Sequence, residues 1–165
     1  GRVQHTGLPY TADDYFAEPN HLLEGGSTGW DIVNDEWIKS IATSRGAVFA
    51  DFNNDGSMDI FVVNRDSPSQ LLINSIGKYK KSVVLSVLNK YGSPALGAIV
   101  QCNIGNKTIT KSVQTAYSYM TANDPRIHIG LGDELKIMNA KVLWLDGTTT
   151  LFGDLNPGKH VLVQE

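Results

Sequence analysis

The chain has 165 residues, of which 41% are hydrophobic, and its 14 Lys and Arg against 17 Asp and Glu give a formal charge of −3. A chain of this size can bury one core, or two small cores that share an interface, without disulfides. The densest basic cluster, Lys78, Lys80 and Lys81, is too small to favour nucleic acid or an anionic membrane as a partner. No apolar run approaches the roughly 18–20 residues that cross a bilayer, and no signal-peptide pattern opens the sequence. We expect a soluble globular protein without nucleic-acid binding or membrane insertion.

The predicted elements begin after a polar lead-in. Residues 1–18 are rich in turn formers and show no sustained period, which indicates an N-terminal arm. Short runs of Val, Ile, Leu and Thr then follow, separated by Gly, Asn, Asp or Pro, and they predict an all-β fold. In chain order these runs are HLLEG, IFVVN, QLLIN, SVVLSVL, GAIVQCNI, KTITKSVQ, RIHIGL, AKVLWL, TTLFG and HVLVQ.

One stretch favours a helix. Trp37, Ile38 and Ile41 could share a face over residues 34–42. Glycines at 29 and 46 leave too little chain for more than two turns. We therefore expect at most one short helix or 3₁₀ turn there.

The second half contains two hairpin signals. Gly105-Asn106 and Asp146-Gly147 supply residues that tolerate the positive φ of a tight turn. They predict antiparallel pairing of the flanking strands. Asn106 also opens an Asn-Lys-Thr glycosylation acceptor pattern, which matters only in a secreted protein.

Two single residues in this half are predicted to be buried. Cys102 is the only cysteine, so no intrachain disulfide is possible, and its alternating context IVQCNI favours a packed, unreactive thiol. Trp144 alternates with Val142 in KVLWL and is assigned to the core. Tyr117 and Tyr119 are expected on one strand face.

A weak internal repeat links the first two leucine runs. At an offset of 49 residues, Pro19 aligns with Pro68, and the Leu22-Leu23 pair aligns with Leu71-Leu72. The aromatic Trp30 falls opposite an aromatic residue of KYKK at the same offset. A period near 50 is that of a propeller blade, and the chain holds one complete period.

The stretch DFNNDGSMDI, residues 51–60, has the pattern of a calcium loop. Calcium takes six to eight oxygen ligands, which a loop supplies from alternate side chains. The candidate ligands are Asp51, Asn53, Asp55, the carbonyl of Ser57, and Asp59. A glycine at position six allows the sharp turn. Position twelve is a valine instead of a bidentate glutamate, so the loop is not an EF-hand.

The alternative interpretation of this stretch is a plain turn, because Asn, Asp and Gly favour turns without any metal. A plain turn does not explain three carboxylates within nine residues, which would repel one another if unpaired. We expect Ca²⁺ as the cofactor, in preference to magnesium or an empty loop.

These motifs resemble two known families. GAVFADFNNDGSMDIFVVNRDSPSQLLIN resembles the FG-GAP/VCBS repeat, with Asn53 in place of the commoner aspartate. Residues from Gly97-Ala98 through HIGLG to the closing HVLVQE resemble the ASPIC/UnbV domain of proteins similar to cartilage acidic protein. The resemblance implies a calcium-binding repeat at 19–78, built as one propeller-type blade, packed against an antiparallel sandwich- or barrel-like β-domain at 79–165.

No catalytic constellation is recognisable. The four histidines, at 5, 21, 128 and 160, have no partner at metal-ligand spacing, and GxSxG is absent. The acidic pairs Asp13-Asp14 and Asp35-Glu36 are interpreted as solvated faces. IGLGD, residues 129–133, lacks the spacing of a phosphate loop and is expected to be a turn that ends a strand. We therefore expect no enzyme activity.

Two functions follow as hypotheses. The first is a non-catalytic, extracellular, calcium-stabilised β module for adhesion or self-assembly, because the apolar runs HLLEG and QLLIN would leave unshielded sheet edges. Its partner would be another copy, with residues 1–18 as strand donor, or another extracellular protein. The second is a carbohydrate-binding or enzyme-accessory domain that presents Tyr10, Tyr15 and Trp30 to a glycan.

Overall fold

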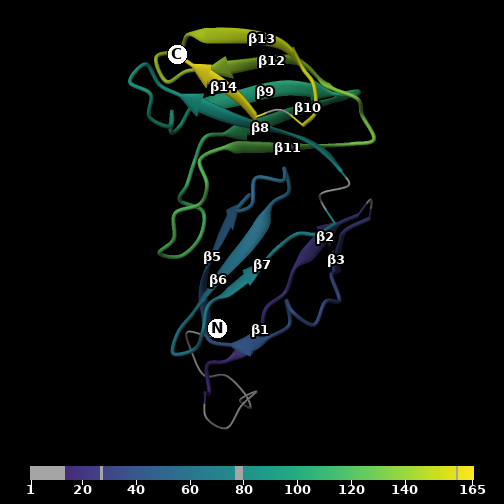
Figure 1. Ribbon diagram of the computed structural model, residues 1–165, viewed down its shortest axis with the longest axis vertical. Coiled ribbons are helices and arrows are strands. Elements are labelled where there is room, and N and C mark those ends of the chain that lie inside the picture. Colours follow the sequence, from purple (N-terminus) through teal and green to yellow (C-terminus); the bar gives the residue numbers. More distant parts are fainter. Residues whose placement is uncertain (1–13, 27, 77–79, 159) are drawn as a thin grey trace.

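The computed structural model describes residues 14–26, 28–76, 80–158 and 160–165. Every regular element within these ranges is a β-strand, so the all-β prediction is confirmed. The strands form two groups, which lie one above the other in Figure 1. No membrane-crossing helix is present in the described part of the chain.

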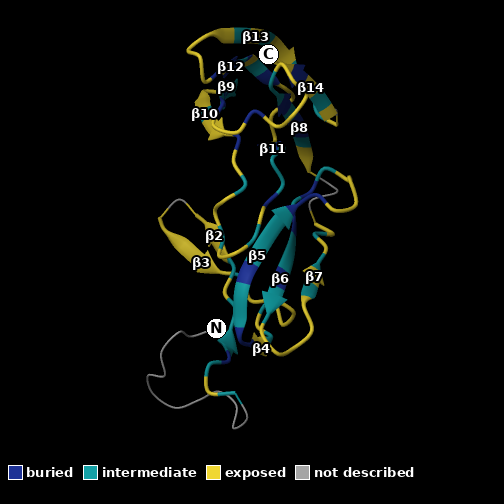
Figure 2. Cartoon of the chain, turned by 90° about the vertical axis from the view of Figure 1, so that its left-hand side faces the viewer, coloured by how far each residue is buried: buried dark blue, intermediate teal, exposed yellow. Residues whose placement is uncertain are grey.

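The N-terminal group contains seven short strands in three small sheets. Its strands are β1 (Glu18–Pro19), β2 (Leu23–Gly25), β3 (Trp30–Ile32), β4 (Ile41–Ala42), β5 (Ser44–Ala50), β6 (Asp59–Asn64) and β7 (Gln70–Leu72). The largest sheet is antiparallel, in the order β5-β6-β7. β1 pairs with β4, and β2 pairs with β3. Most of the apolar side chains in β2 and β3 stay exposed, as Figure 2 shows.

The C-terminal group contains seven longer strands in two sheets. Its strands are β8 (Lys81–Leu88), β9 (Ile99–Ile104), β10 (Lys107–Ser112), β11 (Ile127–Gly132), β12 (Ile137–Leu143), β13 (Thr149–Leu155) and β14 (His160–Gln164). One sheet has the order β10-β9-β12-β13 and the other the order β11-β8-β14. Both hairpins predicted in this half are present, since β9 pairs with β10 and β12 with β13, antiparallel.

The main hydrophobic core lies in this C-terminal group. Both sheets contribute to it, and Leu85, Ile129, Ile137 and Val142 are almost fully buried. Alternate residues of β11 point inward, as expected for a strand with one buried face. Cys102 and Trp144 belong to the same core, so both burial predictions are confirmed.

The stretch 34–42 holds a single turn, within the expected upper limit of one short helix or 3₁₀ turn: the Asp35 carboxylate accepts from the backbone amide of Trp37, and the Asp35 carbonyl accepts from the backbone amide of Lys39 at 3.2 Å. Trp37 is 77% exposed. Two predictions about local structure need correction. Tyr117 and Tyr119 lie in an irregular segment and not on a strand. The C-terminal domain is not purely antiparallel, because β14 pairs with β8 in parallel.

Candidate metal centre

The predicted calcium loop connects β5 to β6. Its two ends are paired, because Ala50 lies opposite Asp59 in the antiparallel ladder. Asp51, Ser57 and Asp59 are buried, and Asp59 has no exposed surface. Carboxylates are seldom buried unless they are paired or hydrogen-bonded, so the partners of these two acids decide what the loop can do.

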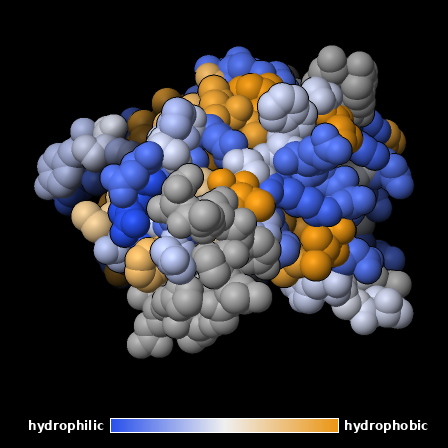
Figure 3. Space-filling view, turned by 90° about the horizontal axis from the view of Figure 1, so that it is seen from below, coloured by the Kyte–Doolittle hydropathy of each residue, from blue (hydrophilic) through white to orange (hydrophobic). Residues whose placement is uncertain are grey.

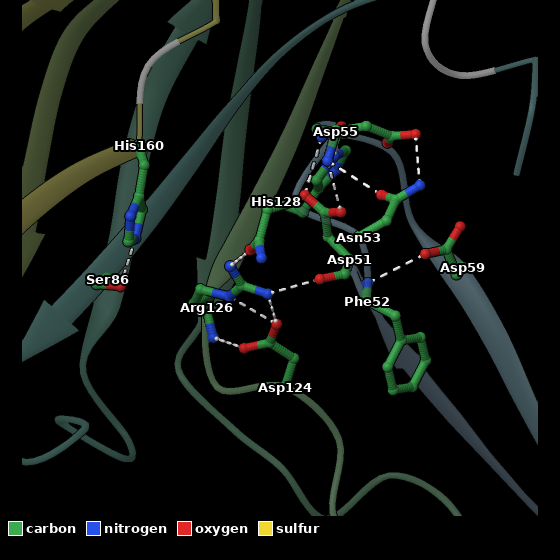
Figure 4. Close-up of polar contacts among 12 residues, drawn as sticks. Asp51, Phe52, Asn53, Asp55, Asp59, Ser86, Asp124, Arg126, His128 and His160 are labelled. Carbon is green, nitrogen blue, oxygen red and sulfur yellow. Dashed lines mark hydrogen bonds and ion pairs between the residues drawn. The ribbon is translucent and has the colours of Figure 1, made fainter. Parts of the chain in front are cut away.

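Three of the predicted ligands share one corner of the loop. The two carboxylate oxygens of Asp51 accept hydrogen bonds from the backbone amides of Asp55 and Gly56, at 3.0 and 2.9 Å. Asn53 donates from its side-chain amide to the Asp55 carboxylate at 2.9 Å and accepts from the Asp55 backbone at 3.0 Å. Figure 4 shows these side chains turned toward one another. The structure thus brings the predicted ligands Asp51, Asn53 and Asp55 together through hydrogen bonds.

Asp59 has other partners. One carboxylate oxygen accepts from the backbone amide of Phe52 at 3.0 Å, a contact drawn in Figure 4. The other accepts from the backbone amide of Asn74 at 2.8 Å. The side chain therefore ties the start of the loop to the segment that follows β7. Both carboxylate oxygens of Asp59 thus hold backbone segments in place, which the spacing of the acidic residues alone did not indicate.

Ser57 presents an unusual feature of the loop. Its backbone amide donates to the Asp55 carboxylate at 2.8 Å. Its hydroxyl oxygen is buried and has no hydrogen-bond partner within the described structure. Buried hydroxyls normally have partners, so this one calls for an explanation such as an ion or a water.

The chemistry of the candidate ligands suits calcium. The side chains of Asp51, Asn53 and Asp55 offer carboxylate and amide oxygens as ligands. Oxygen ligands suit a hard cation such as calcium and not a soft one. Across the described ranges, no three side chains of His, Cys, Asp or Glu gather into a metal-holding group. The ligand atoms therefore fit calcium in type. Asn53 supplies an amide oxygen in place of one carboxylate, and both carboxylate oxygens of Asp59 accept hydrogen bonds from backbone amides.

The C-terminal domain contacts the same loop from outside. Arg126 donates to the Asn54 side chain at 2.8 Å and to the Asp51 carbonyl oxygen at 3.0 Å. Ser82 donates from its hydroxyl to the Gly56 carbonyl oxygen at 2.7 Å, and His128 donates to the same oxygen. These four hydrogen bonds, from three side chains, were not foreseen, because the side chains lie 26 to 75 residues away in sequence from the groups they contact.

Arg126 is itself held in place by an acid. Its guanidinium forms an ion pair with Asp124 at 2.5 Å. The hydrogen bond to Asp124 raises the pKa of Arg126. The guanidinium therefore stays charged and fixed in orientation while its other edge faces the loop.

A second contact joins the two groups of strands along the outer edge of β5. Residues 115–124, which we call the covering segment, run beside this edge. Ser118 accepts from the Ala47 backbone at 3.0 Å, and the side chain of Asn123 accepts from the Phe49 backbone at 2.8 Å. The Phe49 carbonyl accepts from the Asp124 backbone at 3.3 Å, and the rings of Phe49 and Tyr117 stack with centroids 6.3 Å apart. The covering segment shields an edge that would otherwise be open to another chain.

A cleft of about 580 Å³ opens between the loop and the C-terminal domain. Asp51, Asp55, Lys81, Arg126 and His160 are among the residues that line it. His160 shares a hydrogen bond of 2.7 Å with Ser86. Acidic and basic groups are mixed along its walls.

Comparison with known proteins identifies the C-terminal domain. Residues 89–165 match the family model described as ASPIC and UnbV. No FG-GAP/VCBS repeat model matches the N-terminal half. No curated protein matches the chain. The loop, the covering segment and Arg126 thus join a β-layer of unassigned family to a recognised domain, and residues 89–165 are an ASPIC and UnbV domain.

Proposed function

We propose that the loop at 51–59 binds Ca²⁺ and that the chain is a non-catalytic, extracellular β module, stabilised by this ion, for adhesion or self-assembly. Two observations support the ion: the corner made by Asp51, Asn53 and Asp55, and, in the same loop, the buried hydroxyl of Ser57 that has no hydrogen-bond partner within the described residues. The N-terminal half would then be an FG-GAP/VCBS-type repeat with one propeller-like blade.

The position of the loop explains why an ion would stabilise the whole module. The loop lies where the N-terminal sheet meets the C-terminal group of strands, through Ser82 of β8 and through Arg126 and His128 of the ASPIC and UnbV domain. An ion that binds only the folded loop stabilises by RT ln(1 + [L]/Kd), about 2.7 kcal/mol at a hundredfold excess over Kd. Extracellular calcium saturates even modules with Kd near 10⁻³ to 10⁻⁴ M, which cytosolic calcium does not.

Thermal unfolding with chelator and with millimolar calcium tests the ion. We expect a higher Tm in calcium, and we expect Asp55→Asn to remove most of that difference. Asp133→Asn is the matched control, because Asp133 is an exposed acid outside the loop. Equal Tm values for the unsubstituted protein in the two buffers would contradict calcium binding.

Adhesion or self-assembly is supported by the surface of the N-terminal half. Its exposed large hydrophobic side chains include Leu23, Trp30, Ile32, Trp37, Ile41 and Leu71. Figure 3, which views the molecule from below, shows hydrophobic side chains at the surface among hydrophilic ones. Within the described ranges, β2 and β7 each pair on one edge only. Large exposed apolar surface of this kind marks interaction sites on soluble proteins.

Sedimentation velocity in millimolar calcium tests assembly. We expect concentration-dependent association that Trp30→Ser weakens. Leu135→Ser is the control, since Leu135 is also 74% exposed but belongs to the C-terminal domain. A monomer at tens of micromolar, before and after the substitution, would contradict self-assembly and leave adhesion to another protein.

A carbohydrate ligand is the second candidate function. Trp30 is 74% exposed and Tyr15 is 53% exposed, so both present aromatic faces to solvent. Tyr10, the third predicted contact, lies outside the described residues. Glycan-array binding that is lost in Trp30→Ala or Tyr15→Ala would favour this function over adhesion.

A further inference from the structure

We propose that Arg126 is a positioning residue that couples cation binding in the loop to the docking of the ASPIC and UnbV domain. The cation part of this inference rests on the proposed function. The contact between Arg126 and the loop is a separate observation, because it joins protein groups only. Cation binding in the loop should therefore favour docking of the domain, and docking should favour cation binding.

The geometry of Arg126 supports this role. Nε donates to the Asp124 carboxylate at 2.7 Å, and the Arg126 backbone amide donates to the other oxygen of Asp124 at 2.9 Å. Because Asp124 accepts hydrogen bonds from both the side chain and the backbone of Arg126, the planar guanidinium is held in one orientation. Its remaining edge reaches the Asn54 side chain through Nη1 and the Asp51 carbonyl through Nη2. Figure 4 shows Arg126 between Asp124 and Asp51.

The two groups that Arg126 contacts lie on either side of Asn53. Asp51 is the first predicted ligand, and its carboxylate closes the turn by accepting from Asp55 and Gly56. Asn54 has a positive φ of 57°, a conformation that requires support from its surroundings. Holding both positions fixes the backbone that aims Asp51, Asn53 and Asp55 at one point. A loop prepared in this way loses less entropy on binding an ion.

The contact lies in a partly water-excluded place. The side chains of Arg126 and Asp124 are only 23% and 15% exposed. Hydrogen bonds from a charged donor are worth more there than on an open surface. Asp124 also ends the covering segment and donates its backbone amide to Phe49. Movement of Arg126 is therefore connected both to the loop and to the edge of β5.

Thermodynamic linkage makes the coupling reciprocal. If docking improves calcium affinity by some factor, calcium improves docking by the same factor. A purely structural Arg126 would lower the stability of the protein equally with and without calcium. A coupling Arg126 would change the calcium midpoint itself. Typical couplings between sites correspond to about 5- to 150-fold in affinity.

Calcium titration by calorimetry distinguishes the two roles. We expect Arg126→Met to weaken calcium binding at least fivefold while circular dichroism shows a folded protein. Arg126→Lys should weaken it as well, because an ammonium keeps the charge and loses the planar fork. The matched control is Lys136→Met, which removes an ion pair of 2.6 Å with Asp154, away from the loop. Unchanged affinity in Arg126→Met would overturn the proposal.

Hydrogen exchange in chelator provides a readout that needs no ion. The Asp55 and Gly56 amides should exchange faster in Arg126→Met than in Lys136→Met, because the Asp51 backbone is no longer held. If Arg126→Met does not fold, Asn54→Gly removes one of the two contacts and keeps the positive φ accessible. Equal exchange in all variants would overturn the positioning role. Failure of the unsubstituted protein to bind calcium would instead contradict the proposed function alone.

Discussion

The Ser82 hydroxyl donates to the carbonyl oxygen of Gly56 at 2.7 Å, so the tip of the acidic loop is fastened to the start of β8. This contact requires a glycine. Gly56 has a φ of 87°, and a Cβ at this position would lie 2.8 Å from the Ser82 oxygen. The positive φ disfavours a side chain at this position, and a Cβ would also push the Ser82 hydroxyl away from its hydrogen bond with the Gly56 carbonyl.

Gly56→Val should destabilise the protein and weaken calcium binding. Strain at a positive φ costs about 1–3 kcal/mol, and the clash with Ser82 adds to it. Gly92→Val is the control, because Gly92 has a φ of 79° and open space around its Cβ position. Urea unfolding of both variants measures the difference. Equal losses would mean that the contact with Ser82 contributes nothing.

Gly46→Ala should loosen the covering segment. A Cβ on Gly46 would lie 2.6 Å from the Tyr119 carbonyl oxygen and 2.6 Å from a Thr121 methyl carbon. Backbone cannot yield as a flexible side-chain end can, so we expect a loss of about 1–3 kcal/mol. Gly130→Ala in β11, where a Cβ meets nothing within 4 Å, serves as the comparison. Chemical unfolding that gives the same stability for both would contradict this packing.

Asp59→Asn should destabilise the protein whether or not calcium is present. An amide offers one acceptor oxygen where the carboxylate offers two, so the Phe52 or the Asn74 amide loses its partner. An unsatisfied buried donor costs about 1–3 kcal/mol. Asp55→Asn, at an exposed position, should act mainly through calcium. Thermal unfolding of both variants in chelator measures the difference. A Tm for Asp59→Asn equal to that of the unsubstituted protein would show that the two hydrogen bonds of Asp59 are dispensable.

The Cys102 thiol should be unreactive in the folded protein. Burial raises the pKa of Cys102, so the thiol form persists at neutral pH, and the side chain is 2% exposed. A colorimetric disulfide reagent should therefore react within minutes only after denaturant is added. Rapid reaction in native buffer would indicate that β9 opens readily.

The amino-acid pattern located most strands and missed what depends on distant contacts. Apolar runs bounded by turn residues corresponded to β6 through β14, because burial on one or both faces leaves a local record. β5 was not among these runs, since Ser44, Arg45 and Gly46 interrupt its apolar pattern, and Gly46 lies against the covering segment. The parallel pairing of β14 has no local signal, as pairing direction is set by topology.

In the candidate site, too, the local contacts followed from the sequence and the distant contacts did not. Spacing brought Asp51, Asn53 and Asp55 together, because a tight loop with alternating side chains has few other arrangements. It did not foresee that Asp59 would serve two backbone amides, since one of them belongs to Asn74 beyond β7. Nor could it foresee Arg126, which lies 72 and 75 residues along the chain from the loop residues that it contacts.

The parallel pair of β8 and β14 has a consequence for biosynthesis. Val84 in β8 lies opposite His160 in β14. One edge of β8 therefore stays unpaired until the ribosome has made β14. At roughly 5–20 residues per second, a ribosome would need several seconds to proceed from β8 to β14. During that interval the apolar β8 is translated but incompletely paired. Slow-codon or chaperone effects on yield should therefore concentrate between the synthesis of these two strands.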